Sequence, residues 1–551
     1  MVDQYKRDYF HRRVSAMTVE RQSFISHYKE LAEFIQPRRG RFFISDRNKG
    51  DRRYSSIINS KATQAHRIAR SGMLAGTMSP ARPWFALETP DPDMMERSSV
   101  KEWLYKVELI LRAIFNQSNF YNMAPVLLGE LLLFGTGAMS QVDDFENVAR
   151  FYTHTAGSYM IGQNEKLEID TLVREFEWTV NQIVEEFGLE NVSVFVKDQY
   201  DRGNYNIWTP VTHFIEPNPD ADKRKPLSRF KPFRSVYYEP GNLDKNKFLR
   251  ESGFDVFPAY CPRWDVTGED VYGTDCPAMT ALGDIKGLQI EEKRKAQAID
   301  KMVNPPLKGP ASLRNVSVSS LPGSLTIYDS DPQREVLQPL YVVNPQLQEL
   351  RADIQAVERR IDTAFYVDLF LAISQIEGIQ PRNEFDLAHR DAERLLQLGP
   401  VLERLHGEFL NHVIDRTFMQ AVKANILPPP PPELQGMPLK VVYISTLAMA
   451  QRAVATGGID RLAAYVGGLM KVGFTQAGDK FDADQSIDEY AKAIGTPPRV
   501  VVPDDDVNVI RQQRAQEQQA MQQAAMAEQV AGAIQKGGAG VKSLAGAMGN
   551  Q

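Results

Sequence analysis

Hydrophobic residues recur three and four positions apart near the start of the chain, which is the spacing of one helix face. The members of this first stripe are Phe24, Tyr28, Leu31, Ala32 and Ile35. They predict a helix over about residues 15–35 that ends before Pro37, because proline cannot continue a helix. Three further helices are predicted at residues 59–78, 101–117 and 121–134.

The pattern changes between about residues 138 and 260. Short aromatic or alternating runs there predict strands, and one helix is predicted among them near residues 179–187. The runs are FYTHT, YNIWTPVTHFI and FRSVYYE. Because strands and helices do not alternate regularly, the predicted fold class is α+β, mainly helical, and not an array of βαβ units.

Two longer helices are predicted on either side of a proline-rich insert, over residues 278–303 and 346–371. In the second, apolar residues step by three and four positions as along a coiled-coil seam. These residues are Leu347, Leu350, Ile354, Val357, Ile361 and Ala364. Each helix has about 26 residues and is about 39 Å long. Residues 304–344 between them contain six prolines and short β-prone runs.

Helices of matched length on either side of an insert predict an antiparallel hairpin that holds a small β-rich unit about 40 Å from the main body. A lone hairpin cannot bury both its stripe and the flanking apolar residues, so it needs lateral neighbours. The pattern therefore predicts an oligomer.

A third long helix is predicted over residues 383–427, with a kink at Gly399-Pro400. The five prolines at 428–432 end it, and they favour either a stiff polyproline II spacer or a motif for a proline-binding domain. Beyond them we expect a strand at 440–446, two short helices and a strand-like run at 499–503. The Gln/Ala/Met-rich tail from about residue 510 should become helical only beside copies of itself, and the last fifteen residues should be disordered.

Composition bounds the possible functions. The chain has 551 residues, 43% of them hydrophobic, and a formal net charge of −6, which excludes a generally basic nucleic-acid binder. Only two cysteines occur, Cys261 and Cys276, so a disulfide framework and a four-cysteine zinc site are excluded and a reducing compartment is expected. The N-terminal residues lack the apolar core of a signal peptide, and the apolar stretch 126–139 is too short to span a bilayer and carries Glu130, so a buried core helix is expected there. We expect a soluble protein made in the cytoplasm.

A search for catalytic motifs yields none. The nearest approach to a phosphate-binding loop, GGAGVKS at 537–543, lacks the glycine before Lys542, and no H-E-x-x-H or G-x-S-x-G occurs. DADQSIDE at 482–489 lacks the glycine of an EF-hand loop. The run Asp504 to Asp506 resembles a metal-binding strand end but equally suits the start of a helix. We predict no catalytic residue, no metal ligand and no cofactor, although scattered carboxylates could still meet in space.

Basic clusters allow two interpretations. The run PRRGR at 37–41 could touch phosphate, or it could solvate a turn after a helix. Lys293, Arg294 and Lys295 are consecutive on a helix and spread over about 200°, so they cannot form one patch within one chain. In a ring of identical subunits, however, each single lysine becomes a ring of charges.

The sequence resembles the head-to-tail connecting (portal) proteins of short-tailed bacteriophages over about residues 15–500. No single string is diagnostic, but the order and spacing of several strings are specific. The strings are YKELAEFIQPRRGRF (28–42), NSKATQAHRIARSGMLAGTMSPARPWFAL (59–87), FPAYCPRWDVTGEDVYGTDCPAMTALGDIKGLQ (257–289), AIDKMVNPPL (298–307) and LGPVLERLHGEFLNHVIDRTF (398–418), ahead of LPPPPPEL.

The resemblance implies a ring, usually of twelve subunits, at the portal vertex of the capsid, through which double-stranded DNA is packaged and ejected. It also implies how the chain is divided into named parts. These are an N-terminal wing part at 1–277, stem helices at 278–303 and 346–371, a clip at 304–344, a tunnel loop at 372–382, a C-terminal wing part at 383–504 and a crown with a flexible tail at 505–551. The implied partners are capsid and scaffolding proteins, the terminase and tail adaptor or nozzle proteins. The protein would act in the virion after assembly in the host cytoplasm.

Candidate site residues follow from these parts. The tunnel-loop candidates are Gln375, Glu377 and Gly378. The clip candidates for docking the terminase, and later the adaptors, are Leu307, Arg314, Tyr328 and Arg334. The channel candidates for DNA contact are Lys293, Lys301 and Arg382, each of which could instead form a salt bridge between neighbouring subunits. The second stem helix carries a net charge of −2, which suits a wall that passes DNA without holding it.

Two other functions remain as alternatives. An oligomeric scaffold or adaptor could use the same stalk for protein contacts alone, and a DNA-sized open axis distinguishes the portal from it. An enzyme such as a nuclease or ATPase is disfavoured by the missing motifs, and measurable hydrolysis by the purified protein would revive it.

Overall fold

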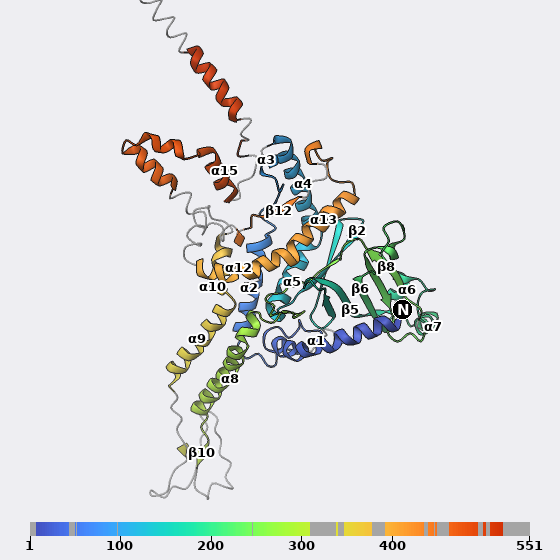
Figure 1. Cartoon of the computed structure of the whole chain (residues 1–551). Coiled ribbons are helices and arrows are strands. Elements are labelled where there is room, and N and C mark those ends of the chain that lie inside the picture. Colours follow the sequence, from blue (N-terminus) through green and yellow to red (C-terminus); the bar gives the residue numbers. More distant parts are fainter. Residues whose placement is uncertain are drawn as a thin grey trace, which may run out of the picture. The chain divides into compact units, whose positions relative to one another are not determined.

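The computed structural model divides the chain into two compact units (Figure 1). Unit 1 comprises Met1–Pro83, Leu111–Ile426 and Ser445–Gln451, and unit 2 comprises Trp84–Ile110, Leu427–Ile444 and Arg452–Gln551. The residues that the structure describes are 7–42, 50, 52–95, 97–244, 246–308, 338–339, 346–376, 392–434, 439–445, 447–448, 462–493, 500–502 and 507–521.

Four helices confirm the predictions for the first third of the chain: α1 (Arg7–Ile35), α2 (Lys61–Met78), α4 (Ser98–Gln117) and α5 (Phe120–Phe134). Helix α1 begins earlier than the stripe predicted, because Phe10 and Met17 extend its buried face. As expected, α5 is a buried core helix. It ends where Gly135 adopts a left-handed φ of 71°, a conformation that glycine reaches without steric cost.

A five-stranded antiparallel sheet with strand order β4-β5-β6-β7-β8 lies in unit 1. Its strands are β4 (Tyr159–Gln163), β5 (Ile169–Thr179), β6 (Trp208–Pro217), β7 (Phe233–Tyr238) and β8 (Arg250–Phe254). Phe10 and Met17 of α1 pack against Met160, Val173 and Phe214 of this sheet. The predicted helix near 179–187 is α6 (Val180–Phe187), and α7 (Val194–Asp201) is an element that the sequence pattern did not predict.

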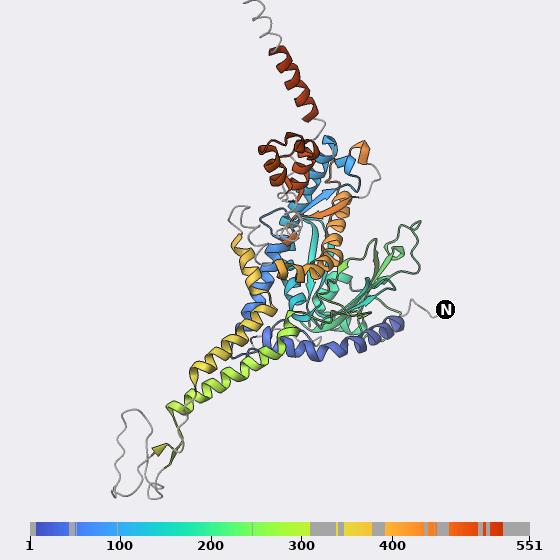
Figure 2. The same ribbon diagram turned by 60° about the vertical axis from the view of Figure 1, so that its left-hand side comes forward.

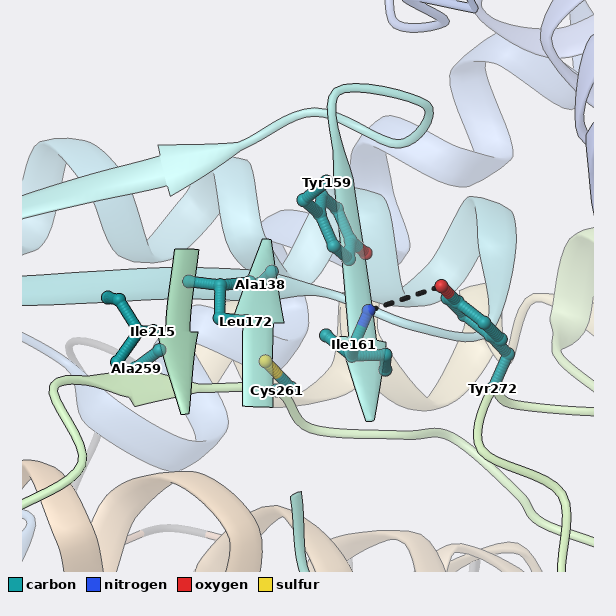
Figure 3. Packing of buried hydrophobic residues seen from close by; sticks show 8 residues of the cluster. All are labelled: Ala138, Tyr159, Ile161, Leu172, Ile215, Ala259, Cys261 and Tyr272. Carbon is teal, nitrogen blue, oxygen red and sulfur yellow. Dashed lines mark hydrogen bonds between the residues drawn. The ribbon is translucent and has the colours of Figure 1, made fainter. Parts of the chain in front are cut away.

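A smaller antiparallel sheet, of order β3-β2-β9, adjoins this core. Its strands are β2 (Ala138–Asp144), β3 (Val148–His154) and β9 (Ala259–Tyr260). Figure 3 shows where the two sheets share buried residues, among them Ala138, Leu172 and Cys261. There the Ile161 N–H donates to the Tyr272 hydroxyl at 3.2 Å, so an otherwise apolar cluster leaves neither group unpaired. The predicted α+β class is confirmed.

Helices α8 (Pro277–Val303) and α9 (Leu347–Ala364) lie side by side in both views of unit 1 (Figure 2). At their far end β10 (Leu307–Lys308) pairs antiparallel with β11 (Gln338–Pro339). The prediction of two helices of matched length was wrong, because α8 has 27 residues and α9 only 18. After α9 the chain turns at Phe365 and Tyr366 and continues as α10 (Val367–Ile376).

The turn between α9 and α10 has a clear packing cause. Tyr366 adopts a left-handed φ of 54°, which reorients the helix that follows. Phe365 then lies edge-to-face with the His66 ring of α2 at 6.4 Å, and Phe370 lies against Gly72 of α2. Phe365 and Phe370 are both buried, whereas an uninterrupted helix would place residues five apart on different faces.

The third long helix, predicted over 383–427 and described from residue 392, has an irregularity that the sequence did not predict. Helix α12 (Ala392–Leu405) continues through Pro400, and a π-helical turn at His406–Leu410 joins it to α13 (Asn411–Lys423). The wide turn buries the consecutive residues Phe409 and Leu410. It also places Glu408 where its carboxylate accepts from the Arg263 backbone N–H at 2.8 Å and from its guanidinium at 2.7 Å.

In unit 2, β1 (Phe85–Glu88) pairs antiparallel with β12 (Lys440–Tyr443), which confirms the strand predicted at 440–446. The Trp103 indole N–H donates to the Pro428 carbonyl at 3.0 Å. Residues 500–502 form a turn and bend, so the strand predicted at 499–503 is wrong for its described residues. Helix α15 (Ala483–Ala493) confirms one of the predicted short helices, and residues 507–521 are helical.

Candidate channel-lining stem

We define the stem hairpin as α8, β10, β11 and α9. Ile58 and Asn59, in the segment that leads into α2, contact this hairpin. Gln289 of α8 accepts hydrogen bonds from the backbone N–H groups of Ile58 at 2.7 Å and Asn59 at 2.8 Å, and donates to the Asn59 carbonyl at 3.0 Å. The Asn59 side-chain amide donates to Glu358 of α9 at 3.0 Å and to Glu292 of α8 at 3.3 Å. One asparagine therefore joins the two helices.

One ion pair and one repulsion between carboxylates show how the two helices of the hairpin align. Arg360 of α9 lies 2.9 Å from Asp284 near the start of α8, while Asp353, earlier in α9, acts on Glu291 further along α8. These pairs show that the two helices run antiparallel. Burial, and then the charge of Asp353, raise the pKa of Glu291. Carboxylates thus lie close together across the hairpin.

Other ion pairs tie the stem to the body of unit 1. Lys61 at the start of α2 lies 2.6 Å from Asp362 of α9, and Lys286 of α8 lies 2.5 Å from Glu30 of α1. These ion pairs join the stem to the body through residues near the start of α8 and the end of α9. Neither pair involves the distal part of α8.

Lys293 and Lys301 both lie on α8 with exposed side chains. Neither forms an ion pair with a carboxylate in the described part of the chain, whereas Lys295, between them in sequence, pairs with Glu292 at 2.9 Å. Eight residues separate the two lysines, hence about 12 Å along the axis and about 80° around it. They follow one side of the helix without touching each other.

The remaining predicted site residues are only partly covered by the structure. Gln375 is the penultimate residue of α10, and Leu307 pairs with Pro339 between β10 and β11. Residues outside the described part of the chain are Arg314, Tyr328, Arg334, Glu377, Gly378 and Arg382. Contacts among the clip and tunnel-loop candidates therefore stay a prediction.

The apolar stripe predicted for α9 faces inward, since Ile354, Val357 and Ile361 are at most 4% exposed. The distal half of α8 differs. Ile290, Ile299, Met302 and Val303 are between 39% and 71% exposed. Ile299, Met302 and Val303 lie within about 100° of one another around α8 and form an exposed row, whereas Ile290 lies on the opposite side. These α8 residues, and not the α9 seam, lack cover within the described chain.

In the PRRGR run, Arg39 contacts buried groups in the interior of unit 1. Arg39 donates to the Val126 carbonyl at 2.9 Å and lies 3.2 Å from Glu130, where Gly129 leaves room for the guanidinium because it has no Cβ. Glu130 also accepts from the Ala156 N–H at 2.9 Å. Burial raises the pKa of Glu130 to about 7, and Arg39 and the Ala156 N–H offset only part of that rise. Arg39 therefore neither solvates a turn nor lies free to touch phosphate, because it pairs with a buried carboxylate.

The His, Cys, Asp and Glu side chains of the described residues are the candidates for a metal centre. No group of three or more His, Cys, Asp or Glu side chains there could hold a metal ion. Cys261 and Cys276 are buried free thiols, and burial raises the pKa of both. None of the described helices has the length and apolarity that a membrane crossing requires.

Comparison with known proteins identifies the family. The family model described as bacteriophage head to tail connecting protein matches residues 7–502. The chain belongs to this family. It is 46% identical over 512 residues to the portal protein of Salmonella phage epsilon15, covering 93% of this chain and 92% of that protein. It is 43% identical over 530 residues to the probable portal protein of Bordetella phage BPP-1, covering 96% and 95%.

Membership gives this head-tail connector a structural role in the virion, at the portal vertex, with capsid and tail as neighbours. The match confirms the resemblance drawn from the sequence. Asn59 and Gln289, which position the connector's stem, were not among the predicted site residues. The sequence held a signal for Gln289, because this polar residue lies beside the apolar positions Ile285 and Leu288 on the predicted helix. The structure shows that its side-chain amide is buried.

Proposed function

We propose that this connector forms a closed ring of identical subunits, twelve in number, through whose axis double-stranded viral DNA is packaged and later ejected. The observation that carries the proposal is the stem hairpin, in which α8 extends beyond the contacts that hold it to the body and exposes both apolar and cationic side chains. Relatives named as portal and probable portal proteins support the same role.

The exposed row Ile299, Met302 and Val303 supports the ring. Apolar side chains along one helix lose contact with water when they pack against another helix, which stabilises the assembly by about 25 cal/mol for each Å² buried. A neighbouring stem is the surface with matching length. When each subunit makes this contact with the next one around an axis, the ring closes and the exposed row of every stem is covered.

The charges of the stem support a channel that conducts DNA without retaining it. Each neutralised phosphate releases counterions, so a densely cationic wall would bind a duplex tightly. Here the exposed cations of α8 that form no ion pair with a described carboxylate are Lys293, Arg294 and Lys301, and the charge of Asp353 on α9 acts on Glu291 of α8. A few rings of lysine on a repulsive wall would centre the duplex and let it slide. Arg382 is proposed as a further cationic position.

We assign docking of the terminase, and later of tail adaptor proteins, to the clip at residues 304–344. The pairing of Leu307 with Pro339 supports this assignment, because it places the two ends of the clip together at the tip of the stem. Arg314, Tyr328 and Arg334 are the proposed contact residues. The end of α10 and the segment after it, with Gln375, Glu377 and Gly378, are proposed as the tunnel loop.

Single-particle electron microscopy of the purified full-length protein tests the ring. The expected result is a closed ring with an axial opening wide enough for a duplex. A ring with a closed axis would favour the scaffold or adaptor function, and a particle of one subunit at micromolar concentration would overturn the proposal.

Packaging tests the conducting role. In a reconstituted reaction with empty capsids, terminase and ATP, the Lys293→Ala/Lys301→Ala variant should form rings yet package DNA at a changed rate. The matched control, Lys166→Ala/Lys197→Ala, removes two exposed lysines far from the stem in sequence and should package normally. An unchanged rate in the stem variant would contradict the assignment of these lysines to the channel.

A further inference from the structure

The loop between β6 and β7, residues 218–232, concentrates positive charge on an acidic chain. It contains five cations and two carboxylates, Asp220 and Asp222, whereas the whole chain has a net charge of −6. The cations are Lys223, Arg224, Lys225, Arg229 and Lys231. Such a concentration departs from the chain average and therefore points to a specific partner.

Two of the five cations are already neutralised. Lys231 lies 3.1 Å from Asp255, which Lys423 contacts at 3.0 Å, and these two hydrogen bonds outweigh burial and hold the pKa of Asp255 below its usual value. Lys225 lies 3.8 Å from Asp222. No ion pair joins Lys223, Arg224 or Arg229 to a carboxylate of the described residues, and all three are exposed.

The loop is preorganised. Asn218 closes it by donating from its side-chain amide to the carbonyls of Arg229 at 2.9 Å and Lys231 at 2.8 Å, and the Asp222 N–H donates to the Phe230 carbonyl at 2.9 Å. The turn at Ser228–Phe230 packs on β8, where a Cβ on Gly253 would lie 2.4 Å from the Ser228 carbonyl oxygen. The cations therefore project from a fixed backbone, and binding does not have to order it.

We propose that this loop is a second DNA-binding surface, in which Lys223, Arg224 and Arg229 contact backbone phosphates of double-stranded DNA outside the channel. Phosphodiesters carry fixed negative charge at regular spacing, which a rigid array of lysine and arginine matches. Protein interfaces are commonly centred on buried aromatic side chains. The one aromatic residue of the loop, Phe230, lies beneath Lys225 at 4.3 Å and Arg229 at 4.8 Å, so it supports the cations and is not presented as an anchor.

This surface is distinct from the stem. The five-stranded sheet that carries the loop and the distal end of α8 lie on different sides of unit 1 in both views (Figures 1 and 2). DNA held there would be a segment other than the one in the channel. The inference therefore goes beyond the conducting role and does not require it.

Binding of the full-length protein to a covalently closed circular duplex tests the inference, because an intact circle cannot be threaded through a closed ring. The variant Lys223→Gln/Arg224→Gln/Arg229→Gln should lose roughly tenfold in affinity, and the slope of log affinity against log salt should fall by about 3 for each loop engaged. The matched control Lys166→Gln/Lys197→Gln/Arg202→Gln makes the same change in charge at exposed positions of the same unit and should bind like the wild type.

Three outcomes would overturn the proposal. The loop variant and the wild type could bind the circle with equal affinity and slope, or the control could lose as much as the loop variant. Alternatively, the loop variant could lose binding to polyglutamate while its binding to the circle is unchanged, which would assign the loop to an acidic protein. The Lys293→Ala/Lys301→Ala variant separates this test from the channel, since it should leave binding of the circle intact.

Discussion

Arg360 of α9 binds a single carboxylate oxygen of Asp284 on α8, with Nη2 at 2.9 Å and Nε at 3.0 Å. The arginine side chain is 56% exposed, and exposed ion pairs contribute about 0–1 kcal/mol to stability. The pair therefore specifies how the two stem helices align more than it stabilises them. The stronger attachment of the stem should come from the buried amide of Gln289.

Replacing Gln289 with leucine should loosen the junction between α8 and the segment before α2. The change leaves the Ile58 and Asn59 N–H groups without their acceptor, at a cost of about 2–4 kcal/mol. Hydrogen exchange of these two amides should become faster, by the factor that corresponds to this free-energy cost. The control Gln297→Leu alters an exposed glutamine of the same helix and should leave both rates unchanged; equal effects would contradict the role of Gln289.

Two glycine-to-alanine substitutions should act in opposite directions. A Cβ on Gly72 would lie 2.2 Å from the Phe370 Cβ, so Gly72→Ala should push α10 away from α2 and destabilise the protein by about 1–3 kcal/mol. A Cβ on Gly283 meets nothing within 4 Å, so Gly283→Ala should stabilise helix α8 by about 0.5–1 kcal/mol. Thermal unfolding measures both, and a higher melting temperature for Gly72→Ala would contradict the packing described.

Glu130 should make stability depend on pH. Burial raises its pKa from 4.5 to about 7 in the folded protein, so the folded state holds this proton more tightly than the unfolded chain. The resulting stabilisation is complete below about pH 4.5 and is lost as the pH rises through 7, by about 2–4 kcal/mol. The melting temperature of the wild type relative to Glu130→Gln should therefore fall between pH 5 and pH 8. Parallel curves would disprove the assignment, and Glu146→Gln at an exposed site should give them.

Charged residues on the exposed row of α8 should weaken assembly. Ile299→Asp/Val303→Asp places carboxylates where the proposed ring would bury methyl groups, so the oligomer should dissociate at higher protein concentration than the wild type. Analytical ultracentrifugation measures this. The control Val194→Asp changes an apolar residue of α7 that is 78% exposed. An unchanged dissociation concentration in the stem variant would place the subunit contacts elsewhere.

Elements with a simple period were predictable from the sequence, while those shaped by tertiary contacts were not. Residues 278–303 were predicted as a helix and α8 is Pro277–Val303, because one apolar face and flanking prolines determine it. The turn at Tyr366 could not be predicted. The stripe of apolar residues continues through it, and only the position of Gly72 explains why Phe370 turns away from α9.

The candidate site was predictable only in outline. Lys293 and Lys301 lie on a helix, as predicted, because the apolar period of α8 runs through both positions, while their contact with DNA stays a prediction. Asn59 was not identified, because its function depends on Glu292 and Glu358, which come near it only after the hairpin folds. Pro400 predicted an irregularity in the third helix, whereas the π-turn lies at 406–410, where Glu408 pairs with Arg263, 145 residues away in sequence.

The short pairing of Leu307 with Pro339 has a consequence for how such connectors diversify. Since the two strands meet at one point, the stretch from 309 to 337 begins and ends at neighbouring positions, and lengthening it costs little in loop-closure entropy. Its sequence can therefore be exchanged between phages, or replaced by a foreign sequence of a different length, while α8 and α9 keep their alignment. Selection for a new binding partner would then act on residues 309–337 and leave α8 and α9 unchanged.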